Sequence, residues 1–455
     1  MFKLKALANR PMVKSILALF TSSLFGRIMG TVYRVALVRA AGQDAVGLIQ
    51  LALPVYRIAR SLATMGLPVA IAKLTAERSE LQRKPDLSVY RKAVSLMLRA
   101  ALLAFAVQAV FSRFFAAVVL ADARTETAII ILALLLIPIA FSSALRGAVQ
   151  GLQRQDFMAG SDIAEVAVRI PVTLGLVALA VPHGPAYLAG AVAAGFLVGE
   201  LACLFVLRIG LKKAVDGYAR GRRHRPAMVC APVRARALLA LGVPVMLTGL
   251  LNNSMNLITV ALIPRLLQET GMSIEEATRA YGRLSGMAVP TLYMPMMLVF
   301  PVTQTMLPEL TRLVAQNAAH SIARLKKLLR KVYLGTLAVS ATVAPLLWFR
   351  ADWLGSILYG DASVGGLIRP LGMVAPFALL GAVSADVLCG LGRTAWVLTG
   401  SLAGNAVRIL LVSMLAGNPA WGIVGVLWAV IADVFLTSVL QLAGVWWVLK
   451  RKIWR

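Results

Sequence analysis

Long runs of hydrophobic residues dominate the chain. A helix needs about 20 apolar residues to cross the roughly 30 Å hydrocarbon core of a bilayer. The runs are too long, and alternate too little, for the strands of a membrane barrel. The pattern therefore predicts an all-α polytopic membrane protein with about twelve transmembrane helices. The stretches that meet the length requirement are residues 12–38, 44–73, 93–111, 127–149, 160–181, 186–208, 237–263, 283–307, 328–349, 366–389, 395–416 and 421–449.

Basic residues gather in alternate loops between these stretches. They flank the first stretch, fill the second, sixth and eighth connections, and close the chain, whereas the intervening loops are short or acidic. Cytoplasmic loops of membrane proteins carry an excess of Lys and Arg. The alternation predicts an even number of spans with both termini in the cytoplasm. The first stretch contains Arg27 and Arg34 and has no small-residue cleavage site, so we do not expect a cleaved signal peptide.

The longest polar interruption, residues 208–236, divides the chain nearly in half. We expect an N-terminal lobe over 1–210, a basic cytoplasmic linker over 211–236 and a C-terminal lobe over 237–455. The basic residues of the linker either only fix the topology or also contact anionic lipid head groups.

An internal repeat supports this division. The segment QGLQRQDFMAGSDIAEVAVRI (150–170) matches CGLGRTAWVLTGSLAGNAVRI (389–409) at a constant offset, with Gly, Leu, Arg, two Ala and Val-Arg-Ile in common. Each copy leaves the fourth span of its half and enters the fifth. Six spans per half keep both copies in the same orientation, which predicts a parallel repeat of two six-helix lobes around a central cavity. This is a transporter layout, and neither a channel nor a membrane enzyme would need the duplication.

The composition narrows the class of protein. Hydrophobic residues make up 59% of the 455 and charged residues 15%, against about 45–50% and about 25% in soluble globular proteins. These values exclude a cytoplasmic enzyme and a disordered chain. The net charge of +28 would suggest nucleic acid in a soluble protein, but here it fits cytoplasmic loops. Three cysteines without CxxC spacing and three histidines indicate no disulfide framework and no metal site, and we expect no cofactor.

Several arginines fall inside or at the edge of the predicted spans. A charge at the centre of a membrane helix costs about 2.5–3.5 kcal/mol on insertion scales. Such residues are tolerated on a wet cavity that faces a negative ligand, or where the side chain reaches an interface. Arg27 lies deepest in the first span, which makes an interfacial position least probable for it. The residues concerned are Arg27, Arg34, Arg57, Arg60 and Arg283.

This set of arginines suits a diphosphate. The planar guanidinium donates two parallel hydrogen bonds and does not lose its proton. A site of several arginines therefore fits a pyrophosphate-linked substrate, whereas an exporter of lipophilic cations would need a carboxylate in the cavity. Spans 1 and 2 offer only Asp44, near their outer end.

Other polar residues inside the spans have two readings each. Glu165 and Arg169 are four residues apart and could pair on one face of the fifth span, as a coupling site or as packing. In the second copy the equivalent positions are Gly404 and Arg408, so only the first half can form this pair. Asn252, Asn253 and Asn256 either line the cavity or bond to a neighbouring helix. Asp386 and Asp433 are expected to be lone acids, candidates for a coupling ion or proton.

The stretch FGRIMGTVYRVALVRAAGQDAVGLIQLALPVYRIARSLATMGLPVAIAKLTAE (25–77) resembles the opening of the stage V sporulation protein B group. That group belongs to the multidrug/oligosaccharidyl-lipid/polysaccharide (MOP) exporter superfamily. The segments 150–170 and YGRLSGMAVPTLYMPMMLVFPVTQTMLPEL (281–310) are similar to its members as well. The resemblance implies two lobes around a cavity that opens alternately to each side, with no covalent chemistry.

The resemblance also implies site residues. Lipid II flippases of this superfamily line their cavity with arginines of the first, second and eighth spans, which fall here on Arg27, Arg34, Arg57 or Arg60, and Arg283. Asp44 falls near the acidic residue that begins the second span. Many relatives carry two further C-terminal helices, whereas this chain stops after span 12. We therefore expect either that the prenyl tail lies in the bilayer between the lobes, or that the substrate is not a long-chain lipid.

The expected function is a flippase of the cytoplasmic membrane for an undecaprenyl-pyrophosphate-linked saccharide, such as a peptidoglycan precursor or a polysaccharide repeat unit. Its expected partners are this substrate, membrane lipids and cell-wall synthesis proteins, with no nucleic acid. Two alternatives stay open. One is a cation-coupled multidrug exporter of the same fold, and the other is a structural partner in an envelope assembly.

Overall fold

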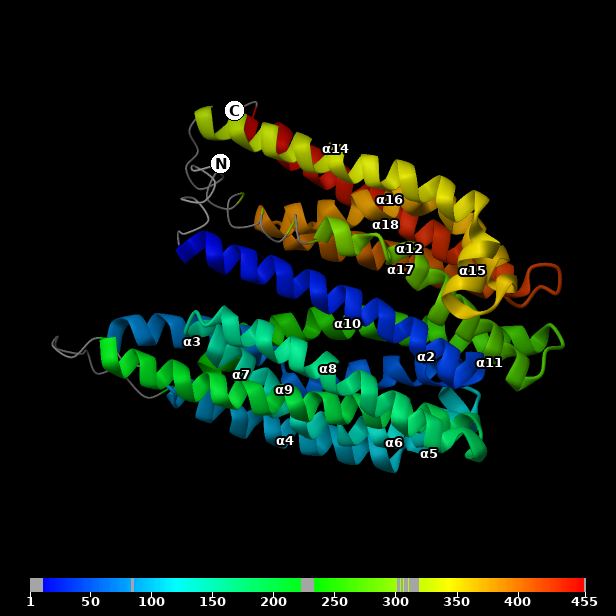
Figure 1. Ribbon diagram of the computed structural model, residues 1–455, viewed down its shortest axis with the longest axis horizontal. Coiled ribbons are helices and arrows are strands. Elements are labelled where there is room, and N and C mark those ends of the chain that lie inside the picture. Colours follow the sequence, from blue (N-terminus) through cyan, green and yellow to red (C-terminus); the bar gives the residue numbers. More distant parts are fainter. Residues whose placement is uncertain are drawn as a thin grey trace. The chain divides into compact units, whose positions relative to one another are not determined.

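The computed structural model describes residues 11–82, 86–221, 233–300, 303, 306, 310 and 319–453, without the side chains of 11–25, 27, 81–82, 217–221, 319–322 and 451–453. All regular structure in these residues is helical (Figure 1), which confirms the all-α class. The helices are α2 (Pro11–Thr64), α3 (Leu67–Gln82), α4 (Ser88–Val110), α5 (Ser112–Phe114), η1 (Phe115–Val119), η2 (Ala123–Thr125), α6 (Glu126–Leu134), α7 (Leu136–Gly151), α8 (Gln155–Ala180), η3 (Val181–His183), α9 (Pro185–Gly221), α10 (Ala235–Glu269), α11 (Ile274–Gly282), η4 (Arg283–Ala288), α12 (Val289–Tyr293), α14 (Ala319–Phe349), α15 (Ala351–Tyr359), η5 (Ala362–Val364), α16 (Gly365–Gly390), α17 (Thr394–Leu415) and α18 (Gly422–Ile453).

The helices are long enough to make this a multi-pass membrane protein. In the described residues nine helices are long and apolar enough to cross a membrane, and α6 with α7, bent by 41°, makes a tenth. One of the nine runs over 53 residues from Ile28 to Glu80, about 80 Å at 1.5 Å per residue. That is more than twice the hydrocarbon thickness, and Gly42 interrupts it with a φ of 77°. Counted as two spans, with η4 and α12 opening another, the helices are compatible with the predicted twelve.

The chain forms two compact units. Unit 1 comprises the residues up to Gly30 and Leu51–Ser254, and unit 2 comprises Thr31–Gln50 and the residues from Met255 onward. Both α2 and α10 therefore contribute to each unit. The predicted lobe boundaries at 210 and 237 stay a prediction, and the middle of the predicted linker, 222–232, lies outside the described residues.

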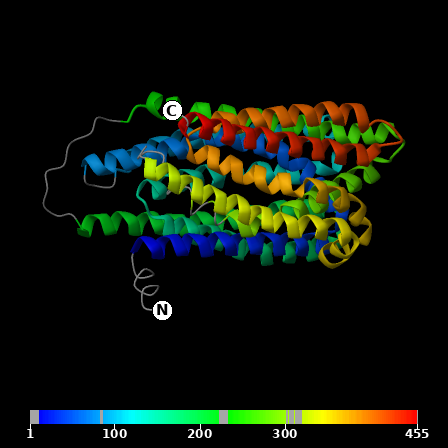
Figure 2. The same ribbon diagram turned by 90° about the horizontal axis from the view of Figure 1, so that it is seen from above.

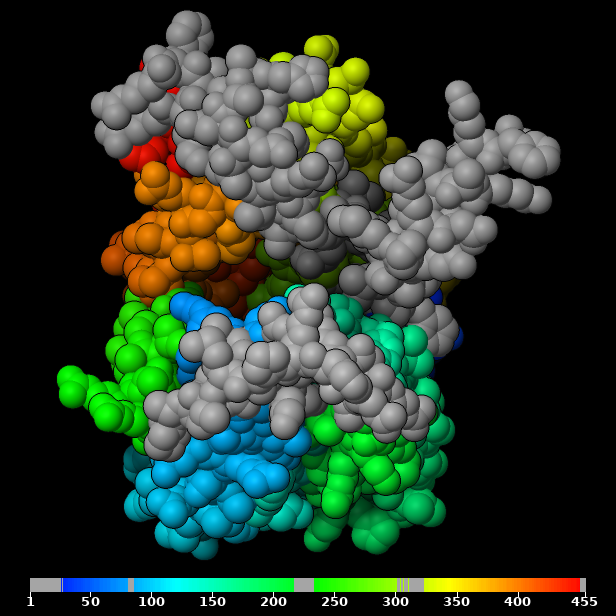
Figure 3. All heavy atoms as spheres, turned by 90° about the vertical axis from the view of Figure 1, so that its left-hand side faces the viewer, coloured from blue at the N-terminus to red at the C-terminus, as the bar shows by residue number. Residues whose placement is uncertain are grey.

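Helix α4 of unit 1 turns mainly small residues inward and several large ones outward. In α4 the buried positions include Ala93, Met97 and Ala101, which recur every four residues. Leu103 and Val110 on the other face are 68% and 76% exposed. Small residues let membrane helices approach closely, and lipid is as apolar as the side chains that face it. Figures 1 and 3 show α3 and the end of α9 at one extremity of unit 1, and Figure 1 shows α5 at the other. The predicted basic segments at 78–82 and 208–213, in the last parts of α3 and α9, thus lie toward the same end.

Unit 2 has its main core between α14, α16 and α18, which lie side by side in Figures 1 and 2. Leu325, Leu329, Val383, Val387 and Val445 are buried there. The short helix α15 connects α14 to η5 and α16. The sequence pattern missed α15, because its nine residues are far too few to cross a bilayer.

The internal repeat is visible in the backbone hydrogen bonds. After α7, Leu152 N donates to the Ala148 carbonyl (3.0 Å) and Arg154 N donates to Val149 (3.1 Å). The turn after α16 repeats these two bonds from Leu391 and Arg393 (2.9 and 2.8 Å), at the 239-residue offset that separates Gly151 from Gly390. Gln153 and Gly392 both adopt a positive φ, 58° and 70°. The sequence repeat therefore corresponds to one helix–turn–helix motif built twice.

The same offset joins a second pair of turns that the sequence comparison did not find. Asp122 N donates to the Ala116 carbonyl (3.1 Å), and Asp361 N donates to the Gly355 carbonyl (3.3 Å). Each aspartate then caps a short 3-10 helix, with its side chain accepting a backbone N–H two residues on. The duplication consequently extends back into the connection between spans 3 and 4 of each half.

Candidate functional site

A sharp break in α2 brings several polar residues of unit 2 together. Gly42 has φ 77° and ψ 173°, which an L side chain rarely adopts. Beyond it the backbone lies very close to α11, and a Cβ at Gly282 would be 2.6 Å from the Gln43 carbonyl oxygen. Glycine on α11 is therefore required for this approach. As a result Arg39, Gln43 and Asp44 lie against α11, η4 and the α15–η5 connection.

Asp44 forms a two-pronged ion pair with Arg279. Arg279 Nε and Nη2 donate to Asp44 Oδ1 and Oδ2, both at 3.0 Å. The hydrogen bond and charge of Asp44 raise the pKa of Arg279. The sequence suggested Asp44 as a substrate contact, and the structure instead shows it engaged with an arginine that sequence reasoning missed. The partners are 235 residues apart, so no local spacing rule could pair them.

Arg283 lies beside Asp361 at the start of the π-helix η4. Its Nε is 3.7 Å from Asp361 Oδ2, and its Nη2 donates to the Ser363 hydroxyl. Gln43 Nε2 donates to the same Asp361 Oδ2 at 2.6 Å. Burial acts to raise the pKa of Asp361, but hydrogen bonds from Ser363, the Arg283 charge and the Gln43 bond together lower it. The carboxylate is thus held in its charged form, with Arg283 as its cationic neighbour.

A cavity of about 520 Å³ adjoins this cluster. Its wall includes Arg39, Gln43, Met287, Tyr359 and Asp361. Arg39 Nε donates to the Leu358 carbonyl at 3.0 Å, and Nη2 donates to that of Ile357. The guanidinium thereby binds carbonyls at the C-terminal end of α15, where a positive charge is favourable.

Arg34 belongs to the same neighbourhood. Its side chain is exposed. Burial raises the pKa of Tyr359, and the hydrogen bond between Tyr359 and Thr291 and the charge of Arg34 oppose this. Arg34 and Arg283 therefore share unit 2 and act on residues of the same cavity wall.

The other predicted arginines belong to unit 1. Arg57 and Arg60 are exposed and one turn apart on α2. The side chain of Arg27 lies outside the described residues. Arg57 and Arg60 therefore belong to unit 1, whereas Arg34 and Arg283 belong to unit 2. A common site for all five arginines stays a prediction.

The asparagines of α10 bond to helices. Asn253 Nδ2 donates to the Ser61 hydroxyl (3.0 Å) and the Arg57 carbonyl (3.4 Å) of α2, which makes it a helix–helix contact. Asn252 Nδ2 donates to the Thr248 carbonyl of its own helix at 3.1 Å. Asn256 is half-buried in the part of α10 that belongs to unit 2.

The predicted pair of Glu165 and Arg169 is present, with Oε1 and Nη1 2.9 Å apart. The sequence did not reveal that it belongs to a larger network in unit 1. Arg146 of α7 forms ion pairs with Asp162 and, at 3.4 Å, with Glu165. This network holds α7 to α8. Whether the Glu165 pair also couples an ion stays a prediction.

The expectation that Asp433 is a lone acid is wrong. Its Oδ2 lies 3.2 Å from Nη1 of Arg408, and its Oδ1 accepts from Thr437 at 3.1 Å. The repeat arginine has therefore kept a carboxylate partner in the second copy, but from α18 instead of its own helix. Asp386 is also bonded, because the Thr303 hydroxyl donates to its Oδ2 at 2.6 Å.

Comparison with known proteins agrees with the resemblance predicted from the sequence. Over 451 residues the chain is 28% identical to stage V sporulation protein B of Bacillus subtilis (strain 168), covering 96% of this chain and 84% of that protein. It is 26% identical over 412 residues, 90% of this chain and 75% of the other, to the uncharacterized membrane protein YabM of the same organism. The predicted resemblance to the sporulation group is confirmed.

Solved structures with a similar fold are transporters and not enzymes. An inward-facing multidrug resistance MATE family transporter of the MOP superfamily matches with a TM-score of 0.70 at 11% identity, over 94% of this chain and 95% of that one. A MOP superfamily transporter from Pyrococcus furiosus matches with a TM-score of 0.67 at 12% identity, over 96% of both chains. At such identities the likeness shows the fold alone, and this fold agrees with the predicted all-α membrane class. Residues 12–314 match the family model described as "Polysaccharide biosynthesis protein". Since this match covers more than half of the chain, the protein belongs to the polysaccharide biosynthesis protein family.

Proposed function

We propose that the protein is a flippase that moves an undecaprenyl-pyrophosphate-linked saccharide across the cytoplasmic membrane by alternating access. The diphosphate binds to the intramembrane arginines, Arg27, Arg34, Arg57, Arg60 and Arg283. The termini and the 208–236 linker face the cytoplasm, as the basic loops indicate. Membership of the polysaccharide biosynthesis family and the MOP transporter fold support this proposal.

One observation carries the proposal. Arg57 and Arg60 lie one turn apart within a span, both are exposed, and neither forms an ion pair with a carboxylate among the described residues. Arg146 and Arg169 of the same unit each have a carboxylate partner. An intramembrane arginine is costly to insert, by about 2.5–3.5 kcal/mol. Two adjacent ones without an acidic partner favour an anionic ligand.

A diphosphate satisfies both side chains. Each guanidinium offers a planar pair of donors that matches two phosphate oxygens. Their one-turn spacing aligns them on one face of α2, so a bridging diphosphate can contact both. Sugar and lipid then extend from the diphosphate without needing a charged partner.

The test is transport in proteoliposomes that contain a fluorescent undecaprenyl-diphosphate saccharide, with exposure on the far side measured by a membrane-impermeant quencher. Arg57→Ala and Arg60→Ala are expected to reduce the rate at least tenfold, and Arg57→Lys to restore part of it. Arg99→Ala is the matched control. Arg99 is also an exposed arginine within a span of unit 1, but it has no second arginine one turn away, so it cannot supply the paired donors that Arg57 and Arg60 offer and should be dispensable.

Wild-type transport by both alanine variants would refute the role of these arginines. A protein that moves no lipid-linked saccharide but exports lipophilic cations would instead identify a multidrug exporter. Loss of transport in Arg99→Ala as well would show that the assay responds to any change of membrane charge.

A further inference from the structure

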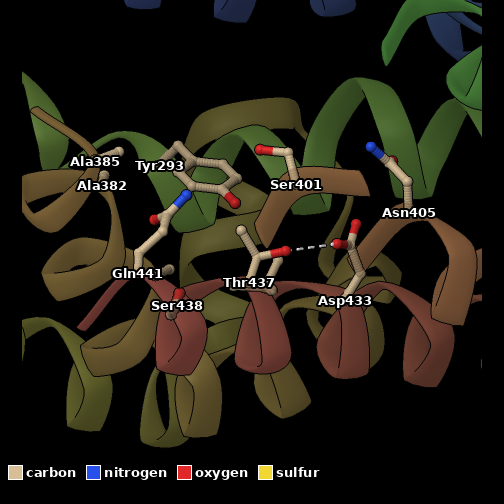
Figure 4. A pocket seen from close by; sticks show the side chains of 11 residues that line it. Tyr293, Ala382, Ala385, Ser401, Asn405, Asp433, Thr437, Ser438 and Gln441 are labelled. Carbon is tan, nitrogen blue, oxygen red and sulfur yellow. Dashed lines mark hydrogen bonds between the residues drawn. The ribbon is translucent and has the colours of Figure 1, made fainter. Parts of the chain in front are cut away.

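A polar hollow lies inside unit 2, between α12, α16, α17 and α18. Its volume is about 280 Å³. Figure 4 shows Ser401 and Asn405 of α17 across from Thr437 and Gln441 of α18, with Tyr293 at one side. Hydroxyl and amide groups dominate this wall, in a part of the chain where apolar residues are the rule.

The charges around the hollow do not favour binding of a cation. Its single carboxylate, Asp433, is 3.2 Å from Arg408 Nη1, and the pair is largely buried. Arg408 Nη2 also donates to Asn405 Oδ1 at 2.7 Å, so the amide oxygen of Asn405 already accepts a hydrogen bond from the arginine. A metal ion beside Asp433 would meet the arginine charge at close range, and the low dielectric of the interior strengthens that repulsion.

Gln441 is the residue that points to a ligand. It is only 5% exposed, and no described residue hydrogen-bonds to its side-chain amide. Figure 4 shows the amide directed into the hollow. The amide nitrogen and oxygen are accessible from the hollow, since they are not among the buried unpaired atoms of the described residues. Together with the hydroxyls of Ser401 and Tyr293, they are available to a bound group that both donates and accepts hydrogen bonds.

From this geometry we infer that the hollow holds one sugar ring of the transported saccharide, an inference that rests on the proposed function. Neutral hydroxyl and acetamido groups match an uncharged wall of amides and hydroxyls. Tyr293, 40% exposed, offers an aromatic face with a polar tip. Pockets for drug-sized ligands occupy about 300–1,000 Å³, so a hollow of about 280 Å³ fits a single ring and excludes a lipid tail.

The experiment compares two ligands on the full-length protein in nanodiscs: undecaprenyl diphosphate, and undecaprenyl diphosphate that carries one N-acetylhexosamine. Gln441→Leu is expected to weaken binding of the sugar-bearing ligand about tenfold and to leave undecaprenyl diphosphate unchanged. Ser401→Ala should act in the same direction with a smaller effect. Thr399→Val is the matched control. Thr399 is exposed on α17, the helix that carries Ser401, and its hydroxyl donates to the Trp396 carbonyl of that helix.

Thermal unfolding tests whether Gln441 only supports the fold. Gln441→Leu removes an amide that faces the hollow and bonds to no described residue, so its melting temperature without ligand should equal or exceed that of the wild type. If Gln441→Leu binds each of the two ligands as tightly as the wild type does, the sugar subsite is overturned, but the proposed function is not. A wild type that binds neither ligand overturns the proposed function and the subsite with it. Sodium-dependent stabilisation that Gln441→Leu abolishes, with ligand binding unchanged, would assign the hollow to a cation and overturn the inference.

Discussion

The Arg408–Asp433 pair should respond very differently to the loss of either partner. Replacing Asp433 with asparagine is expected to destabilise the protein more than replacing Arg408 with glutamine. An arginine keeps its charge in any protein environment, so Arg408 would stay buried and uncompensated. Asp433 without its arginine can take up a proton and keep the hydrogen bond from Thr437.

The structure sets the size of the effect. The side chains of Arg408 and Asp433 are 18% and 14% exposed. Removing one partner of such a buried pair costs about 3–5 kcal/mol. Because an asparagine still accepts one hydrogen bond, we expect about 3 kcal/mol for Asp433→Asn. For Arg408→Gln we expect about 1–2 kcal/mol, the range for one imperfectly satisfied polar group, and the double variant should lie close to the second value.

The assay is thermal unfolding of purified protein in detergent, for the two single variants and the double. Arg369 and Asp352 supply the matched control in the same unit. Their ion pair is 2.7 Å long, but the side chains are 46% and 59% exposed, so Asp352→Asn should cost less than about 1 kcal/mol. If Arg408→Gln is more destabilising than Asp433→Asn, or if Asp433→Asn matches the exposed control, the burial argument is refuted.

Three further predictions concern activity, pH and topology. Arg27→Ala should abolish transport at normal membrane expression and Arg27→Lys should retain part of it, because lysine lacks the bidentate fork; wild-type flipping by the alanine variant would contradict an anionic site. Although burial acts to raise it, the pKa of Asp361 is lowered in the folded protein. The charged carboxylate therefore stabilises the fold at pH values above its unfolded pKa of about 3.9. This stabilisation is lost as the pH falls through the folded pKa. The difference in melting temperature between wild type and Asp361→Asn should therefore be constant near neutral pH and shrink below about pH 4, and a difference that grows on acidification would contradict the sign. A cysteine at position 222 should resist an impermeant thiol reagent in intact cells, whereas ready labelling would overturn the assigned topology and the count of twelve spans.

The features that the sequence could predict are those with a local or periodic signal. The spans follow from apolar length, and the turn after Gly151 follows from its repeat at Gly390. The pair of Glu165 and Arg169 follows from a spacing of four on one helix. These signals depend on neighbouring residues, so tertiary structure is not needed to recognise them.

The features that the sequence could not predict are pairings between distant helices. Asp44 with Arg279, and Arg408 with Asp433, join residues whose proximity depends on how whole helices pack. The sequence comparison noted that Gly404 replaces Glu165, and this suggested that the second arginine lost its partner. In the structure Arg408 instead pairs with Asp433 of α18, a contact that only the packing of α17 against α18 reveals.

The twice-built turn at Asp122 and Asp361 gives the two oxygens of each carboxylate separate structural roles. In both copies Oδ1 accepts the backbone N–H two residues on, at 3.1 and 2.9 Å. The other oxygen differs, since Oδ2 of Asp122 bonds to Arg124 of its own turn and Oδ2 of Asp361 bonds to Gln43. The cap thus uses one oxygen in the same way in both copies, and the second oxygen bonds to a different partner in each copy. Asparagine can keep the capping oxygen at both positions, but it removes the charge that faces Arg124 at 122 (2.7 Å) and Arg283 at 361 (3.7 Å). We therefore expect asparagine to be tolerated less readily at 122, where the carboxylate is 1% exposed and the ion pair is shorter.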